Sequence, residues 1–189
     1  MTILIGILVI LVILVALVGF GIIGFNKLRT TDIGAQEALG GIDVQLTRRA
    51  DLIPNLVNTV KGYAAHEKGV FEEVTKARAA VAAAAKGDDV PAKAAADAEL
   101  SQALVKVNAV AEAYPDLKAN QNFLELQTQL AETENQISFA RQYYNDAVAT
   151  LNKLTQTIPW MFLTGIANVH KRDFYEAPEG HDVAPAVEF

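Results

Sequence analysis

The first 25 residues form one apolar block with the length of a membrane-spanning helix. Met1 to Phe25 holds twenty hydrophobic residues, four glycines and one threonine, and the first charged side chain is Lys27. As a helix, Ile3 to Phe25 would extend about 35 Å, against about 30 Å for the hydrocarbon core of a bilayer. The basic start and small-residue cleavage site of a secretory signal peptide are both missing. Residues 1–25 are therefore predicted to be a retained transmembrane anchor in the lipid bilayer.

Two positive charges indicate how this anchor is oriented. Lys27 and Arg29 follow the apolar block directly, whereas only the chain terminus is positive ahead of it. Lys and Arg are enriched on the cytoplasmic side of membrane spans. The pattern therefore favours a single-pass protein of the cell membrane with the rest of the chain in the cytoplasm.

Glycines gather near the end of the anchor, at Gly19, Gly21 and Gly24. Small residues let two spanning helices approach closely, so this face predicts contact between copies within the membrane. Glycine is also common in spans that make no such contact, which is the structural alternative.

Beyond the anchor, apolar residues recur every three or four positions, which is the period of an amphipathic helix. From Leu46 to Val81 they form a heptad seam, meaning a stripe of core positions spaced alternately by four and three. This seam predicts one continuous helix over residues 46–86, about 60 Å long.

Two further helices are expected after this first one. A more polar seam predicts a helix of about 57 Å over residues 120–157. The Ala-rich stretch 91–113 predicts a shorter helix that ends at Tyr114-Pro115. The fold class is therefore predicted to be all-α, an N-terminal transmembrane helix followed by an elongated antiparallel bundle of three to four long helices.

The same patterns divide the chain into four parts. Residues 1–25 are the anchor, and residues 26–45 are expected to be a stalk or juxtamembrane helix that packs poorly, since they contain three glycines and few large apolar residues. Residues 46–169 are the predicted bundle. Residues 170–189 lack helical periodicity and are expected to be extended or disordered.

Four charged residues fall on seam positions, Glu67 and Arg78 in the first seam and Glu134 and Arg141 in the second. A charge at a core position is costly unless it is paired. In an antiparallel pair of helices, one register would bring Glu67 opposite Arg141 and Arg78 opposite Glu134. We expect these pairs to fix the register, and a binding cleft lined by the four residues is the functional alternative.

Pro54 interrupts the first seam. Proline has no amide hydrogen to donate to the carbonyl of Ala50, so it either kinks the helix or begins a new one. Arg48, Arg49 and Asp51 flank this point. The two arginines would cap freed carbonyls, or all three residues would form a patch that faces a partner.

A short apolar stretch, Trp160-Met161-Phe162-Leu163, follows the second seam. It is expected either to cover the end of the bundle or to contact lipid, and Trp160 and Phe162 are its candidate contact residues. Unexplained apolar patches mark a partner or a membrane. Together with the glycine face and the weakly apolar stalk, this stretch predicts a homo-oligomer.

Composition excludes several classes of function. The net charge is -6 with no basic stripe, which argues against a nucleic-acid partner, and the absence of cysteine excludes disulfides and thiolate chemistry. His66-Glu67 begins like a zinc-protease HExxH motif, but Val70 stands where the second histidine is needed. The sequence contains no phosphate-binding loop and no nucleophile elbow. We therefore expect no enzymatic activity, no cofactor and no metal.

Two long segments resemble the signatures of the bacterial LemA family. The first is RRADLIPNLVNTVKGYAAHEKGVFEEVTKAR, from Arg48 to Arg78, and the second is YPDLKANQNFLELQTQLAETENQISFARQYYNDAV, from Tyr114 to Val148. The resemblance implies a membrane-anchored helical bundle of the bacterial envelope, in a family with no securely assigned enzymatic activity. Magnetosome-associated relatives suggest a part in membrane organisation.

The expected function is therefore a non-enzymatic scaffold that contacts itself or other envelope proteins at the bacterial inner membrane. The alternative is a regulatory adaptor or accessory subunit of a membrane protease, transporter or stress-response system. An enzyme or small-ligand receptor would need a pocket that the sequence does not indicate.

Overall fold

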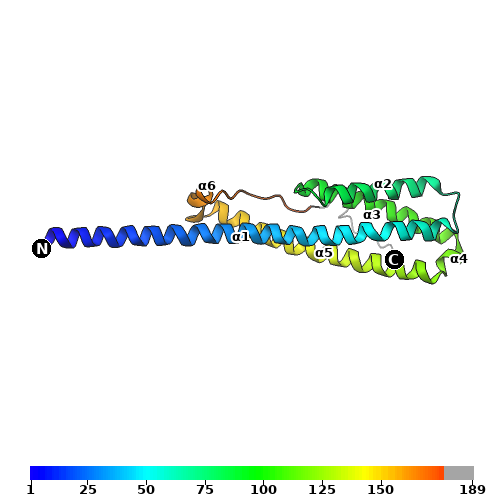
Figure 1. The fold of residues 1–189 in the computed structure, drawn as a ribbon, viewed down its shortest axis with the longest axis horizontal. Helices are drawn as coiled ribbons and strands as arrows, with labels where there is room; N and C mark the ends of the chain where they lie inside the picture. Colours follow the sequence, from blue (N-terminus) through cyan, green and yellow to red (C-terminus); the bar gives the residue numbers. More distant parts are fainter. Residues whose placement is uncertain (177–189) are drawn as a thin grey trace, which may run out of the picture. The chain divides into compact units, whose positions relative to one another are not determined.

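The computed structural model describes residues 1–176, and these are helical apart from short turns and an extended last segment (Figure 1). The elements are α1 (Thr2–Lys61), α2 (Lys68–Ala84), α3 (Val90–Ala113), α4 (Pro115–Lys118), α5 (Gln121–Gln156), the 3-10 helix η1 (Trp160–Leu163) and α6 (Thr164–Ala167). No strand occurs among these residues, so the all-α prediction is confirmed. The chain divides into two compact units.

The larger unit is a four-helix bundle built from residues 39–144 together with residues 173–176. It contains the last part of α1, all of α2, α3 and α4, and the first part of α5. Short turns reverse the chain between successive long helices, and α2 packs side by side with α3 (Figure 1). Its fully buried apolar side chains come from every long helix and include Leu46, Ile53, Leu56, Val60, Val74, Val81, Leu100 and Ile137.

The prediction of one helix over residues 46–86 is wrong, because the chain turns between Lys61 and Lys68. The amides of Tyr63 and Ala64 both donate to the carbonyl of Val60, at 3.0 and 2.9 Å, and this closes the last turn of α1. Gly62 begins the turn. The heptad spacing continues across the break because Ala64 is itself buried, so the period alone does not reveal that two helices share the seam.

The predictions for residues 91–113 and 120–157 are confirmed within one residue at each end by α3 and α5. Both helices begin with a side-chain cap. Asp89 accepts a hydrogen bond from the amide of Ala92 at 2.9 Å, and Asn120 accepts one from the amide of Phe123 at 3.0 Å. Such caps satisfy amides that have no partner in the first helical turn.

The smaller unit combines residues 1–38 with residues 145–172. Leu28, Ala35 and Ala38 of α1 are buried within it, and so are Val148 and Leu151 of α5. The expectation that residues 26–45 pack poorly is therefore wrong. This part of α1 packs through alanines such as Ala35 and Ala38 and not through large apolar side chains. Their small size lets the neighbouring helix approach closely.

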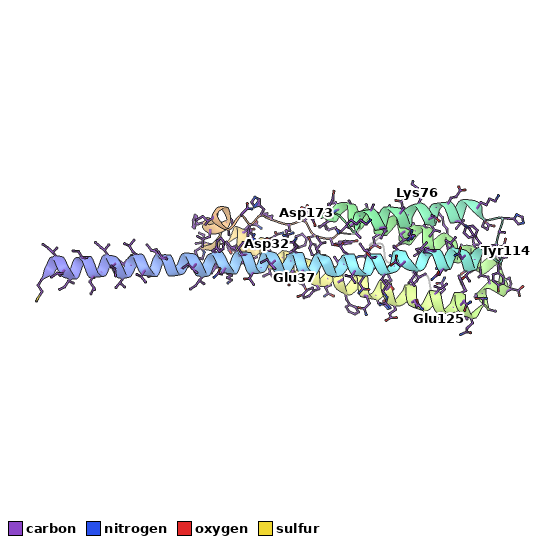
Figure 2. All side chains as sticks on the ribbon, viewed as in Figure 1. Asp32, Glu37, Lys76, Tyr114, Glu125 and Asp173 are labelled. Carbon is purple, nitrogen blue, oxygen red and sulfur yellow. The ribbon has the colours of Figure 1, made fainter. Side chains whose placement is uncertain are left out.

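The apolar start of α1 is exposed along its length. Every large hydrophobic side chain from Ile3 to Val18 is at least half exposed, and Figure 2 shows these carbon-only side chains projecting from the helix. The most apolar window has a mean hydropathy of 3.5 and none of it is buried. Among the described residues, α1 is the one helix that is long and apolar enough to cross a membrane.

The chain leaves α6 through Asn168 and continues as an extended segment to Glu176. In the smaller unit, Arg172 pairs with Asp32, with 2.8 Å between Nε and Oδ1. Its backbone amide and carbonyl also hydrogen-bond to the side-chain amide of Asn152, at 3.0 and 2.9 Å. The part of the predicted tail from residue 177 to residue 189 lies outside the described residues.

Pro54 lies inside α1, and the helix continues through it to Lys61 rather than restarting. The carbonyl that Pro54 leaves without an intrahelical donor belongs to Ala50. Arg78 of α2 donates to this oxygen from Nε at 3.0 Å. The expected capping of a freed carbonyl by an arginine therefore occurs, but the arginine is Arg78 and not Arg48 or Arg49. An arginine in the seam and a proline in the facing helix compensate for each other.

Replacing Arg78 by methionine should lower the free energy of unfolding by about 1–3 kcal/mol, because the Ala50 carbonyl then stays buried without a donor. In a Pro54→Ala background the same replacement should cost clearly less, since the introduced alanine supplies the missing amide. Unfolding of the detergent-solubilised chain, followed by circular dichroism, measures both differences. Lys76→Met, at an exposed position of α2, is the control; equal losses in the two backgrounds would contradict the coupling.

Candidate functional site

A buried carboxylate, Asp97 of α3, is the centre of a charge cluster in the bundle. Its side chain is fully buried, and Arg49 Nη1 of α1 lies 2.8 Å from its Oδ1. Arg141 of α5 pairs through Nη2 with Oδ2 of the same carboxylate. One aspartate thus joins three of the four bundle helices. We call Arg49, Asp97, Glu134, Arg141 and Tyr175 the Asp97 cluster.

Glu134 adds the second negative charge of the cluster. Its Oε2 lies 2.8 Å from Arg49 Nη1, and its Oε1 lies 4.0 Å from Arg141 Nη1. Two guanidinium groups are therefore matched by two carboxylates. Because isolated charges are costly to bury, these pairs make the buried Asp97 and Arg49 compatible with a packed core, whereas the Glu134 and Arg141 side chains are 43% and 27% exposed.

Tyr175 brings the extended C-terminal segment to the cluster. Its hydroxyl donates to Asp97 Oδ2 at 3.2 Å, and the Arg141 guanidinium carbon lies 5.2 Å from the centre of its ring. Two residues earlier, the Tyr144 hydroxyl of α5 donates to the carbonyl of Asp173 at 2.9 Å. Burial, with the neighbouring Asp97 charge second, raises the pKa of Tyr175 far above its ordinary value, so the phenol stays protonated as a donor.

This geometry stabilises structure and does not suit catalysis. Asp97 already accepts from two arginines and a tyrosine, and its side chain has no exposed surface to offer a substrate. A general base needs an accessible lone pair near the proton that it removes. The cluster therefore fixes the register of α1, α3 and α5 and holds the segment that carries Tyr175.

The predicted seam pairs are wrong. Arg141 pairs with Asp97 and Glu134 rather than with Glu67, and Arg78 binds the Ala50 carbonyl rather than Glu134. The reason is the turn after Lys61. It places Glu67 at the N-cap of α2, where its side chain makes no capping hydrogen bond, instead of in the middle of a long helix.

The three residues around Pro54 do not share one surface. Arg49 is buried in the cluster, whereas Arg48 and Asp51 are exposed on α1, and Pro54 is exposed as well. A patch that uses all three charged residues is therefore contradicted. Arg48 and Asp51 stay candidates for contact with a partner.

A second buried ion pair, between Lys93 of α3 and Asp43 of α1, was not expected from the sequence. Lys93 is fully buried, and its ammonium group pairs with the Asp43 carboxylate and lies 3.5 Å from the carbonyl of Ala85. Desolvation raises the pKa of Asp43, although the hydrogen bond and charge of Lys93 act in the opposite direction.

Sequence reasoning missed Asp97 and Lys93, although a signal was present. Lys93, Asp97, Leu100, Leu104, Val107 and Ala111 step by alternating four and three along α3, and all six are buried. The four apolar members of this stripe begin at Leu100. Extending the same spacing toward the N-terminus would have placed both charged residues in the core.

The described residues offer no group of three or more His, Asp or Glu side chains that could hold a metal ion. A surface groove of about 710 Å³ lies along α2, bordered by Lys61, Lys68, Phe71, Glu72 and Lys76. At the edge of this groove, Lys61 Nζ lies 5.5 Å from the centre of the Phe71 ring. The groove does not include any residue of the Asp97 cluster.

A second cluster lies in the smaller unit, where the segment after α5 contacts α1. The Trp160 ring stacks on Phe20 with 5.7 Å between ring centres and 14° between planes. Lys27 Nζ lies 4.7 Å from the centre of the Trp160 ring. A Cβ atom at Gly24 would stand 3.2 Å from the Trp160 ring and would overlap the tip of Leu163. Gly24 therefore lets η1 approach α1 closely; we call Phe20, Gly24, Lys27, Trp160 and Leu163 the aromatic clamp.

The clamp changes the interpretation of the glycine face. Gly24 is covered by residues of its own chain, whereas a Cβ at Gly19 or Gly21 would meet no described atom within 4 Å. Phe162 belongs to the same 3-10 helix as Trp160 but is largely exposed. Of the three glycines, only Gly19 and Gly21 stay available for contact with another helix.

An exposed apolar helix that continues into an all-α bundle with a charge-balanced core defines a membrane-associated helical-bundle protein. The LemA family model matches residues 38–189, and the chain belongs to the LemA family. The match includes the whole bundle and every residue of the Asp97 cluster.

Curated relatives give a second comparison. The chain is 26% identical to magnetosome proteins MamQ 1 and MamQ 2 of Paramagnetospirillum magneticum, over 88% of its own length and 70% of theirs. It is 25% identical to magnetosome protein MamQ of Magnetospirillum gryphiswaldense over the same shares. The family match and these relatives agree with a membrane-associated protein of a family not known for catalysis.

Replacing Asp97 by asparagine should destabilise the bundle more than replacing Arg141 by methionine. Without the Asp97 charge, buried Arg49 keeps only Glu134, and removing one partner of a buried pair costs about 3–5 kcal/mol. Without Arg141, Asp97 still has Arg49 and Tyr175. Denaturant unfolding of the detergent-solubilised chain measures which variant loses more free energy of unfolding. Glu99→Gln, at a half-exposed neighbour in α3, is the control, and a larger loss for Arg141→Met would contradict this assignment.

Tyr175 should ionise only well above the ordinary range of a tyrosine, because burial raises its pKa. Its pKa is raised in the folded chain, so the folded state binds more protons than the unfolded state above about pH 10, and stability falls as the pH rises through that range. Alkaline titration of phenolate absorbance should lose a high-pH step in Tyr175→Phe, and the control Tyr143→Phe, at an exposed site, should keep that step. Ionisation of Tyr175 in the ordinary range of a tyrosine would contradict its burial beside Asp97.

Proposed function

We propose that this protein is a non-enzymatic scaffold, anchored by one helix in the bacterial inner membrane, that presents its bundle to other copies or to other envelope proteins. The observation that carries the proposal is the continuity of α1 from Thr2 to Lys61. Its exposed apolar start has the length of a membrane span, and its end supplies Arg49 to the core of the bundle. One helix thus supplies both the proposed anchor and one of the four helices of the bundle.

The interior of the bundle supports a role without catalysis. The charged groups at the centre of the bundle are paired with one another, and the Asp97 carboxylate has no exposed surface. The family match and the relatives named magnetosome proteins are further support for a task at a membrane. Interaction through surfaces is then the activity that the geometry favours.

Self-association is part of the proposal, but fewer features support it than the sequence suggested. The stalk packs within its own chain, and Gly24 is covered by Trp160 and Leu163. Of the three glycines near the end of the apolar block, Gly19 and Gly21 are not covered by their own chain, and they are the proposed contact between copies in the membrane. A partner of unlike sequence would instead make the protein an adaptor or accessory subunit.

The bundle is proposed to lie in the cytoplasm, because Lys27 and Arg29 follow the span. Asp88 offers a site to examine this, since it is exposed in the turn between α2 and α3 and the chain has no cysteine of its own.

The test uses cells that carry the full-length Asp88→Cys variant. The protein should stay in the membrane after alkaline carbonate washing, and an impermeant thiol reagent should label it only after the cells are opened. Labelling of intact cells would reverse the orientation, and release by carbonate would contradict the anchor.

The same membranes, dissolved in mild detergent, test the scaffold. The purified protein should be larger than one subunit by mass photometry, or should retain an envelope protein in a fixed ratio. Gly21→Leu should reduce self-association, while Gly40→Leu, at an open exposed position beyond the span, should not. A single subunit with nothing bound would contradict the scaffold.

A further inference from the structure

The segment from Ile158 to Ala167 has an apolar side that no described residue covers. Ile158, Phe162 and Ile166 are 73%, 71% and 74% exposed, and Met161 is 42% exposed. Soluble surfaces carry such residues singly, whereas a contiguous set marks a binding surface. We call these four residues the outer face of η1 and α6.

The opposite side of this segment is attached to α1. Trp160 stacks on Phe20 and Leu163 contacts Gly24, so the segment stands beside the last two turns of the apolar block. The outer face is therefore continuous with the exposed apolar surface of α1. Whatever medium surrounds Phe20 also surrounds the Trp160 ring that lies on it.

The height of the aromatic clamp corresponds to the edge of a bilayer. Phe20 and Lys27 are seven positions apart, which is about 10 Å along a helix and comparable to the zone between hydrocarbon and water. Tryptophan is enriched in this zone because one part of its ring system is apolar and its N–H is polar. Lys27 places its charge over the same ring, as lysines near the ends of spans do.

We propose that η1 and α6 form an interfacial element that inserts Ile158, Met161, Phe162 and Ile166 into the same membrane that α1 crosses. The proposal rests on the membrane span of the proposed function. Lipid is the occupant that fits, because the face joins the anchor surface and contains no charged residue from Ile158 to Ala167. The protein then contacts the bilayer at two points of its chain, more than a hundred residues apart.

The test places a single tryptophan at one of three positions in the full-length chain. Trp160 is the chain's one tryptophan, so Trp160→Phe provides a background that keeps an aromatic ring in the clamp. In this background, Phe162→Trp reports on the outer face and Ile10→Trp reports on the middle of the anchor. Phe139→Trp is the matched control, since Phe139 of α5 is 68% exposed in the bundle.

Each variant is reconstituted into vesicles of equal parts phosphatidylcholine and phosphatidylglycerol, with the acyl chains brominated either near the headgroup or near the methyl end. The Phe162→Trp emission should shift to the blue of the Phe139→Trp emission and should be quenched most strongly by bromine near the headgroup. The Ile10→Trp emission should be quenched most strongly by bromine near the methyl end. The Phe139→Trp emission should be quenched by neither kind of brominated lipid.

The outcomes separate the two proposals. If brominated lipid does not quench the Ile10→Trp emission, the membrane span itself is contradicted. Deep quenching at Ile10→Trp without quenching at Phe162→Trp leaves the span intact and overturns the interfacial element. A blue-shifted but unquenched Phe162→Trp emission also overturns it, because a second copy or another protein then covers the outer face.

Discussion

The bundle depends on the ion pairs that converge on Asp97. Burying a carboxylate is unfavourable unless its charge and its hydrogen-bonding capacity are met, and here Arg49, Arg141 and Tyr175 meet them from three separate segments. An apolar core tolerates small slips between helices, since one aliphatic contact replaces another. A buried ion pair does not, because a shift of one turn leaves each charge alone. Asp97 therefore determines how α1, α3 and α5 align, and Glu134 completes the balance of charge.

The sequence predicted the fold class and the limits of α3 and α5, because each follows from local chemistry. Period, proline and capping residues act within a few positions of the chain. The turn after Lys61 was missed because buried Ala64 keeps the heptad spacing on both sides of it. A pattern of apolar positions records which residues are buried and does not record whether one helix or two bury them.

The site was harder to predict than the fold, for a reason that Arg78 illustrates. The sequence-based prediction assumed that each charged seam residue pairs with a residue of opposite charge on the facing helix. Arg78 instead binds a backbone oxygen that Pro54 has freed, and no charge pattern identifies such an acceptor. Arg141 is partly buried and pairs with Asp97, which lies in an Ala-rich helix whose charged positions resembled a surface. The prediction that residues 26–45 pack poorly was wrong for a related reason. Ala35 and Ala38 are buried because small side chains let the helices approach closely, and a count of large apolar residues does not reveal such packing.

The positions of the cluster residues along the chain also bear on how the protein is made. Synthesis delivers Arg49 first, then Asp97, then Glu134 and Arg141, and Tyr175 comes after all of them. Because folding of a nascent chain proceeds from its N-terminal side, Arg49 and Asp97 are both available before α5 leaves the ribosome. α5 then docks on a pair of charges that already exists, and Tyr175 supplies the last donor. A chain cut short before Glu134 leaves Asp97 without Arg141 and Arg49 without Glu134, so incomplete copies differ from finished ones by poorly satisfied charges that quality control can act on.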